Sequence, residues 1–143
     1  MTALATDKEV AEKSAEDIQI VPIAAATIIY KGALCMINAA GYLAPCTPTA
    51  TSQFAGVAAE GKNNSAGAAG DLSARVYRHG RFAVVAAGQT QANVGDAAYA
   101  ADDQTIGSST TNAQYVGTVC EFVSATEVRV DISSATGTPT LHA

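Results

Sequence analysis

Tryptophan is absent from this chain of 143 residues, and aromatic residues are few, with three Phe and five Tyr. The apolar fraction of 48% is high, but it includes 31 alanines. Burial of apolar surface contributes roughly 25 cal/mol per Å², so a core rich in alanine is only weakly stabilising. The length suits one compact domain. We therefore expect contacts with neighbouring molecules to supply part of the stability.

Positive charge is also scarce, with eight Lys and Arg against 13 Asp and Glu and a net charge of −5. Nucleic-acid binding needs a basic stripe, so no nucleic-acid partner is expected. No apolar run reaches the roughly 18 residues that span a bilayer, and the acidic start does not fit a secretory signal. We therefore expect no membrane association and folding in a reducing cytoplasm.

Residues suited to catalysis are few. The three cysteines, Cys35, Cys46 and Cys120, form no C-x-x-C pair, so we expect reduced thiols and no zinc or redox site. The two histidines, His79 and His142, have no evident nucleophile or carboxylate partner. The chain is therefore predicted not to be an enzyme, with no catalytic residues, no cofactor and no metal site.

Two short patterns superficially resemble ligand sites. Asp102 and Asp103 are adjacent acids, but calcium loops need more oxygen ligands at regular spacing, and a turn in which Asp binds its own backbone fits better. Residues 61–70 are rich in glycine and asparagine. They lack a phosphate-binding fingerprint, so we expect a flexible surface loop there.

The chain divides into three parts by composition. Residues 1–17 hold seven of its 21 charged residues, and Thr6 and Glu9 have capping-box spacing, so this stretch is predicted to be a flexible or short-helical N-terminal arm. Residues 18–132 form a single β domain in this interpretation. Residues 133–143 are small, polar and contain proline, which predicts a flexible C-terminal tail.

The pattern of the central part is typical of a small β-barrel, β-tulip-like or sandwich domain, because short apolar runs alternate with turn residues. Pro22 cannot donate a ladder hydrogen bond, so the first run is expected at a sheet edge. Hairpins are expected across residues 38–41, 79–80 and 123–126. The expected strands lie within residues 18–30, 33–37, 42–44, 54–59, 72–78, 81–86, 97–100, 105–106, 115–122 and 127–132.

An internal repeat suggests two related β-units packed face to face. Residues 53–60 and 114–121 share the pattern Gln, aromatic, x, Gly, x, x, x, Glu, at a period of about 62 residues. The aromatic would anchor a layer, and the glycine would permit a bulge. Chance similarity in an Ala- and Gly-rich chain is the alternative.

Positive charge gathers in one place, at Arg75, Arg78, His79 and Arg81. Strand alternation directs Arg75 away from Arg78. The cluster is either a solvated turn or a contact point for an acidic surface on a partner protein, where Arg is favoured.

Six segments follow one another in a characteristic order and spacing: 29–43 (IYKGALCMINAAGYL), 54–59 (FAGVAA), 79–82 (HGRF), 94–99 (VGDAAY), 116–119 (VGTV) and 128–132 (VRVDI). Through these segments, residues from about 27 to 132 resemble the capsid-decoration (cement, head-stabilising) proteins of tailed bacteriophages. The resemblance implies a β-barrel or β-tulip-like domain, commonly a homotrimer, that stabilises the expanded head by bridging major capsid subunits on its exterior. It implies a virion location, with host cytoplasm during assembly.

Two segments are the candidate capsid contacts on this interpretation. The extended stretch from residue 18 could add to an exposed capsid sheet by β-augmentation, and the basic cluster could meet an acidic surface. The alternatives are a virion-surface binding module, such as a head fibre or glycan-adhesive domain, and a small hydrolase or lyase, for which no candidate set is found. The candidate capsid-binding residues are Ile18, Ile20, Val21, Pro22, Ile23, Arg78, His79 and Arg81.

Overall fold

A computed structural model describes residues 18–136 and shows a mainly β protein, which confirms the predicted fold class. The predicted N-terminal arm and residues 137–143 of the predicted tail lie outside the described residues. The described elements are β1 (Ile18–Pro22), β2 (Thr27–Ile29), β3 (Leu34–Ile37), β4 (Leu43–Pro45), β5 (Gln53–Ala58), β6 (Lys62–Asn64), β7 (Ser73–Tyr77), β8 (Arg81–Val85), the 3₁₀ helix η1 (Gln91–Asn93), β9 (Ala97–Ala100), β10 (Ile106–Gly107), β11 (Tyr115–Ser124) and β12 (Glu127–Asp131).

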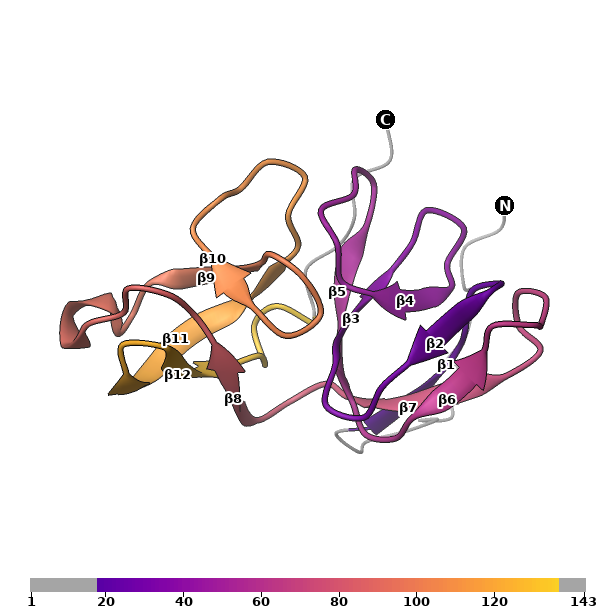
Figure 1. Cartoon of the computed structure of the whole chain (residues 1–143), viewed down its shortest axis with the longest axis horizontal. Helices are drawn as coiled ribbons and strands as arrows, with labels where there is room; N and C mark the ends of the chain where they lie inside the picture. The colour runs from indigo at the N-terminus through magenta and orange to yellow at the C-terminus, as the bar shows by residue number, and fades with distance from the viewer. Residues whose placement is uncertain (1–17, 137–143) are drawn as a thin grey trace, which may run out of the picture.

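Ten of the strands form two antiparallel sheets of the same topology, which lie in two lobes side by side (Figure 1). One sheet has the order β1-β7-β5-β3-β4, and the other, read from the matching edge, β8-β12-β11-β9-β10. With β2 and β6 set aside, each strand has the same rank within its unit as its counterpart. We call residues 18–78 unit 1 and residues 81–136 unit 2; this topology confirms the prediction of two related β-units.

The correspondence extends to single hydrogen bonds. A reciprocal pair of backbone bonds fixes the approach to β3 in unit 1 and to β9 in unit 2. The four bonds are Gly32 N to Ala58 O (2.9 Å), Ala58 N to Ala33 O (2.9 Å), Gly95 N to Val119 O (2.8 Å) and Val119 N to Asp96 O (2.9 Å). Because the two halves share both strand order and hydrogen-bond register, chance is a poor explanation for the sequence repeat.

Each sheet curls until its two edges meet at one end. An isolated parallel bridge joins Ile23, just after β1, to Leu43 in β4, and a second joins Val85 in β8 to Thr105, just before β10. The result is a half-barrel in each unit. Along residues 18–22, β1 lies at the edge of its sheet, as Pro22 predicted.

Unit 1 contains an insertion that unit 2 lacks, the two-stranded sheet of β2 and β6. The prediction that residues 61–70 form only a flexible loop is therefore wrong. The cause is Asn64, which is 3% exposed and whose amide donates to Ala24 O at 3.0 Å and Ala68 O at 3.1 Å. A buried amide that satisfies two carbonyls anchors a segment whose polar composition alone suggests solvent.

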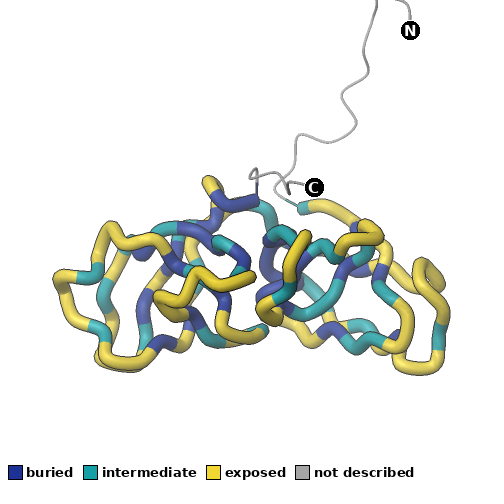
Figure 2. The backbone as a smooth tube through the Cα atoms, turned by 90° about the horizontal axis from the view of Figure 1, so that it is seen from above, coloured by how far each residue is buried: buried dark blue, intermediate teal, exposed yellow. Residues whose placement is uncertain are grey.

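Two apolar clusters fill the molecule, and buried residues line the inside of each lobe and their junction (Figure 2). One cluster is the interior of unit 1, including Ile23, Leu43 and Val76. The other combines the interior of unit 2 with the opposite face of the unit 1 sheet. That face contributes Leu34, Met36, Phe54 and Val57. The core of unit 2 is therefore completed by unit 1.

The hairpins expected at residues 38–41 and 123–126 are confirmed, since β3 pairs with β4 and β11 with β12. The hairpin expected at His79 and Gly80 is wrong, because β7 pairs with β1 and β5 whereas β8 pairs with β12. These residues instead carry the chain from one unit to the other. Gly80, at φ +122°, adopts a conformation that favours glycine.

The prediction of a loosely attached tail from residue 133 is wrong for its first four residues. Ala135 is 1% exposed and Thr136 is 5% exposed. Thr136 Oγ1 donates to Arg78 O at 2.7 Å. Small residues with one hydroxyl can pack tightly where the chain crosses between units, which composition alone does not reveal.

Candidate functional site

The first predicted contact segment forms the edge strand β1, where alternation divides its side chains between two faces. Ile20 is 67% exposed and Pro22 is also exposed, whereas Val21 and Ile23 are buried at 5% and 0%. Val21 and Ile23 therefore serve the core of unit 1 and could meet a partner only through their backbone. Ile18 is half-buried.

Arg78 connects β1 to the end of the described chain. Its guanidinium donates to Gln19 Oε1 and to Thr136 O, and its own carbonyl accepts the Thr136 hydroxyl. A hollow of about 70 Å³ opens beside it, lined in part by Gln53 and Phe54. The structure thus brings together the predicted segments 18–23 and Arg78, which are far apart in sequence.

The other members of the predicted basic cluster do not share this position. His79 is exposed, and Arg81 lies in unit 2, 3.8 Å from Asp131 Oδ2. The Ser133 hydrogen bonds, followed by the charges of Arg81 and His79, hold the pKa of Asp131 below its ordinary value. The cluster is therefore partly neutralised by a carboxylate on its own chain.

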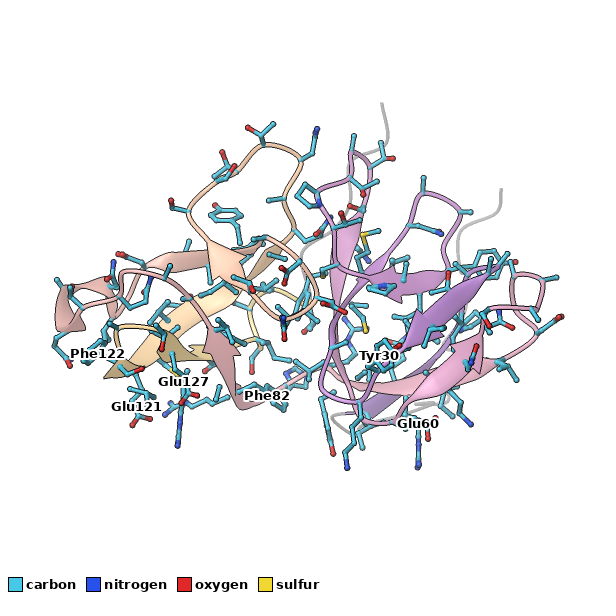
Figure 3. The ribbon with its side chains drawn as sticks, viewed as in Figure 1. Tyr30, Glu60, Phe82, Glu121, Phe122 and Glu127 are labelled. Carbon is cyan, nitrogen blue, oxygen red and sulfur yellow. The ribbon has the colours of Figure 1, made fainter. Side chains whose placement is uncertain are left out.

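Arg75, which the sequence directed away from Arg78, forms a separate ion pair with Glu60 at 3.2 Å. The equivalent pair in unit 2 joins Arg129 and Glu121 at 3.5 Å. Glu60 and Glu121 project from the lower edge of the two lobes (Figure 3). Surface pairs of this kind contribute little to stability, and the two pairs join equivalent neighbouring strands in the two sheets.

Gln114, the first residue of the second repeat motif, is a feature that sequence reasoning missed. It is 2% exposed, and its Nε2 donates to Thr47 O at 2.9 Å and Ser52 Oγ at 2.7 Å in unit 1. Its Oε1 is buried without a hydrogen-bond partner among the described residues. Its place in the repeat was the available signal, and its role is to tie the two units together.

The described acidic residues and surface hollows bear on ligand binding. No group of three or more His, Cys, Asp or Glu in residues 18–136 could hold a metal ion. Asp102 Oδ1 accepts the amides of Gln104 at 2.9 Å and Thr105 at 2.7 Å, which confirms the predicted turn. The hollow of about 150 Å³ beside Tyr99 is smaller than the roughly 300 Å³ at which small-molecule pockets begin.

No helix within the described span is long and apolar enough to cross a bilayer. Comparisons with known proteins found no matching family model, no matching curated protein and no matching solved structure.

Proposed function

We propose that this chain is a capsid-decoration protein of a tailed bacteriophage. It binds the outer surface of the expanded head and bridges neighbouring major capsid subunits, as a homotrimer located on the virion after assembly in the host cytoplasm. The observation that carries the proposal is the edge strand β1, with Ile20 67% exposed. The family resemblance supplies the identity of the partner.

An edge strand presents backbone N–H and C=O groups that a second strand can pair with. Strand addition of this kind gives affinity through main-chain hydrogen bonds, and exposed side chains give specificity. In β1 the exposed Ile20 lies opposite Arg75 in the sheet register. The edge therefore offers an apolar side chain beside a charged one.

The edge is held in place before any partner arrives. Arg78 binds Gln19 within β1 and also the backbone of Thr136. A strand already fixed against its sheet loses less conformational freedom on binding than a free peptide. Many identical copies on a lattice then give high avidity from a modest contact at each site.

The test is co-sedimentation of the purified protein with expanded empty heads of its own virus. The variant Ile20→Asp places a charge on the exposed edge without touching the core, and Val123→Asp, at a 42% exposed position late in β11, is the matched control. We expect Ile20→Asp to weaken binding at least about tenfold, a change of 1.4 kcal/mol. The control should bind as the unmodified protein does.

Binding should also raise the melting temperature of the heads, because a ligand of the native state stabilises it by mass action. The proposal fails if the unmodified protein binds no expanded head of its own virus. It also fails for the β1 edge if Ile20→Asp binds as tightly as the control.

A further inference from the structure

The two units bury equivalent sheet faces to very different extents. In unit 1, the face that packs on unit 2 is almost fully buried: Leu34 1%, Met36 5%, Phe54 2% and Val57 5% exposed. In unit 2, the sheet register places Ala97, Tyr99, Tyr115 and Thr118 at the same four positions, and all four are exposed or half-buried.

The contact between the units is not reciprocal. Leu34 N in unit 1 donates to Asp103 O in unit 2 at 2.7 Å. By register, Leu34 corresponds to Ala97 in unit 2, and Asp103 corresponds to Ala40 in unit 1. Ala97 and Ala40 are both exposed, so the equivalent contact is not made. A non-reciprocal contact uses different surfaces on its two partners, so one copy of each surface is left over. The exposed face of unit 2 is the leftover copy of the face that unit 1 buries.

This face, which we call the tyrosine face, carries an aromatic pair. Tyr99 and Tyr115 are opposite each other in the sheet, with ring centroids 5.8 Å apart and planes at 55°. The Tyr115 hydroxyl lies 3.3 Å from Thr118 Oγ1 and 3.1 Å from Ser134 Oγ, which holds its ring in place. Fixed tyrosines with an apolar ring and a polar tip tolerate both water and burial.

Beside Tyr99 lies the hollow of about 150 Å³, whose other lining residues include Pro48, Ala101 and Ala113. Pro48 belongs to unit 1, so the surface continues across the unit boundary. Tyrosine is enriched in protein interfaces and charged residues are depleted from their cores. The named residues of the tyrosine face and the hollow carry no charge.

We propose that the tyrosine face is an interface between copies of this chain. Its occupant is a second copy, because the equivalent face in unit 1 is already covered by a β-unit of this same topology. At two positions the tyrosine face is more polar than the equivalent face of unit 1: Tyr99 corresponds to Met36, and Thr118 to Val57. These side chains suit a surface that contacts water in the free chain and is buried after association. The inference does not depend on capsid binding.

The test is the molar mass in solution, measured by light scattering over a concentration series. The unmodified full chain should reach a multiple of the monomer mass, and Tyr99→Asp should weaken this association at least about tenfold, because a carboxylate would be buried without a partner. The matched control is Tyr30→Asp, at a 65% exposed tyrosine that follows β2 in unit 1 (Figure 3). Circular dichroism spectra should be the same for all three proteins, which checks that each variant is folded.

A second measurement locates the contact. Benzoylphenylalanine at position 99 should form a covalent dimer on irradiation, whereas the same group at position 30 should not. The inference is overturned if the unmodified chain stays monomeric throughout, if Tyr99→Asp associates normally, or if position 99 forms no cross-link between copies. Failure of Tyr99→Asp to bind heads while the unmodified chain stays monomeric would assign the face to the capsid; the proposed capsid binding would stand, and the proposed homotrimer would not.

Discussion

Gly56 and Gly117 occupy the same point in the two sheets, with φ of +144° and +140°. A Cβ on Gly56 would lie 2.1 Å from Tyr77 O, and a Cβ on Gly117 would lie 2.1 Å from Asp131 O. Both glycines follow an aromatic residue at a bulge in the ladder. The duplicated half-barrel thus depends on one close backbone approach made twice.

Replacing either glycine by alanine should destabilise the protein strongly. This backbone conformation is available almost only to glycine, so an alanine held in it costs about 1–3 kcal/mol. The clash between the added Cβ and the carbonyl oxygen adds to this cost. We expect Gly56→Ala and Gly117→Ala each to lower the free energy of unfolding by about 3 kcal/mol or more, measured by urea denaturation. Gly107→Ala is the control, because nothing lies within 4 Å of its Cβ position; equal effects at Gly107 and Gly56 would contradict the argument.

Phe54 and Tyr115 are equivalent aromatics with unequal burial, so truncating them should have unequal effects. Phe54 is 2% exposed in the cluster shared by both units, and Phe54→Ala should lower the free energy of unfolding by about 3–5 kcal/mol. Tyr115 is half-buried, and Tyr115→Ala should lower it by about 1–2 kcal/mol. Urea midpoints of the two variants check this, and a larger loss at Tyr115 would show that the assignment of burial is wrong.

The cysteines should differ sharply in reactivity. Burial, together with the charge of Asp103, raises the pKa of the Cys35 thiol to about 12, and burial raises the pKa of Cys46 well above its ordinary value. Cys120 is half-buried. Because the thiolate is the reactive form, iodoacetamide should modify one thiol in the native protein and all three after denaturation, as counted by intact mass spectrometry. Rapid native labelling at Cys35 would contradict the buried geometry.

Acid should destabilise the protein in part through Glu60 and Asp131. Loss of solvent raises the pKa of Glu60, but the hydrogen bonds from Arg75 and the nearby charges outweigh it, so the pKa lies below 4.5. The Ser133 hydrogen bonds lower the pKa of Asp131 below 3.8. A carboxyl whose pKa is lower in the folded state stabilises folding above its unfolded pKa, and this contribution disappears as the pH falls through the folded value.

The free energy of unfolding should therefore begin to fall as the pH drops below about 4.5, the ordinary value for Glu60. Both groups are half-buried at the surface and screened by solvent, so the change at each is small. Urea midpoints at neutral and acid pH check this, and Glu60→Gln with Asp131→Asn should flatten the profile. An unchanged profile in the double variant would remove these two carboxyls from the explanation.

Local structural features could be predicted from the sequence. Pro22 predicted the edge position of β1 because it has no N–H to donate, and Asp102 predicted a turn because its carboxylate binds nearby amides. The paired motifs beginning at Gln53 and Gln114 predicted the duplication. Each of these depends on backbone preferences and short-range hydrogen bonds, which a few consecutive residues determine.

Long-range contacts could not be predicted from the sequence. His79 and Gly80 have the composition of a hairpin turn but link two units, because the pairing of β7 and β8 is decided by distant strands. Asn64 is buried because carbonyls at Ala24 and Ala68 converge on its amide. In the sequence Arg78 is only a basic residue near a turn, whereas the fold brings Gln19 and Thr136 beside it.

The strand-rich class, the edge strand, the turns and the repeated half could be predicted from the sequence, since they follow from side-chain periodicity and from what glycine, proline and aspartate do to a backbone. Which copy of the repeated face is buried and which stays exposed depends on how the two units pack together. Phe54 and Tyr115 stand at matching points in matching strands, and their burial differs because one face meets the other unit and its counterpart does not. Burial depends on what packs against a surface, and no local pattern within either repeat contains that information.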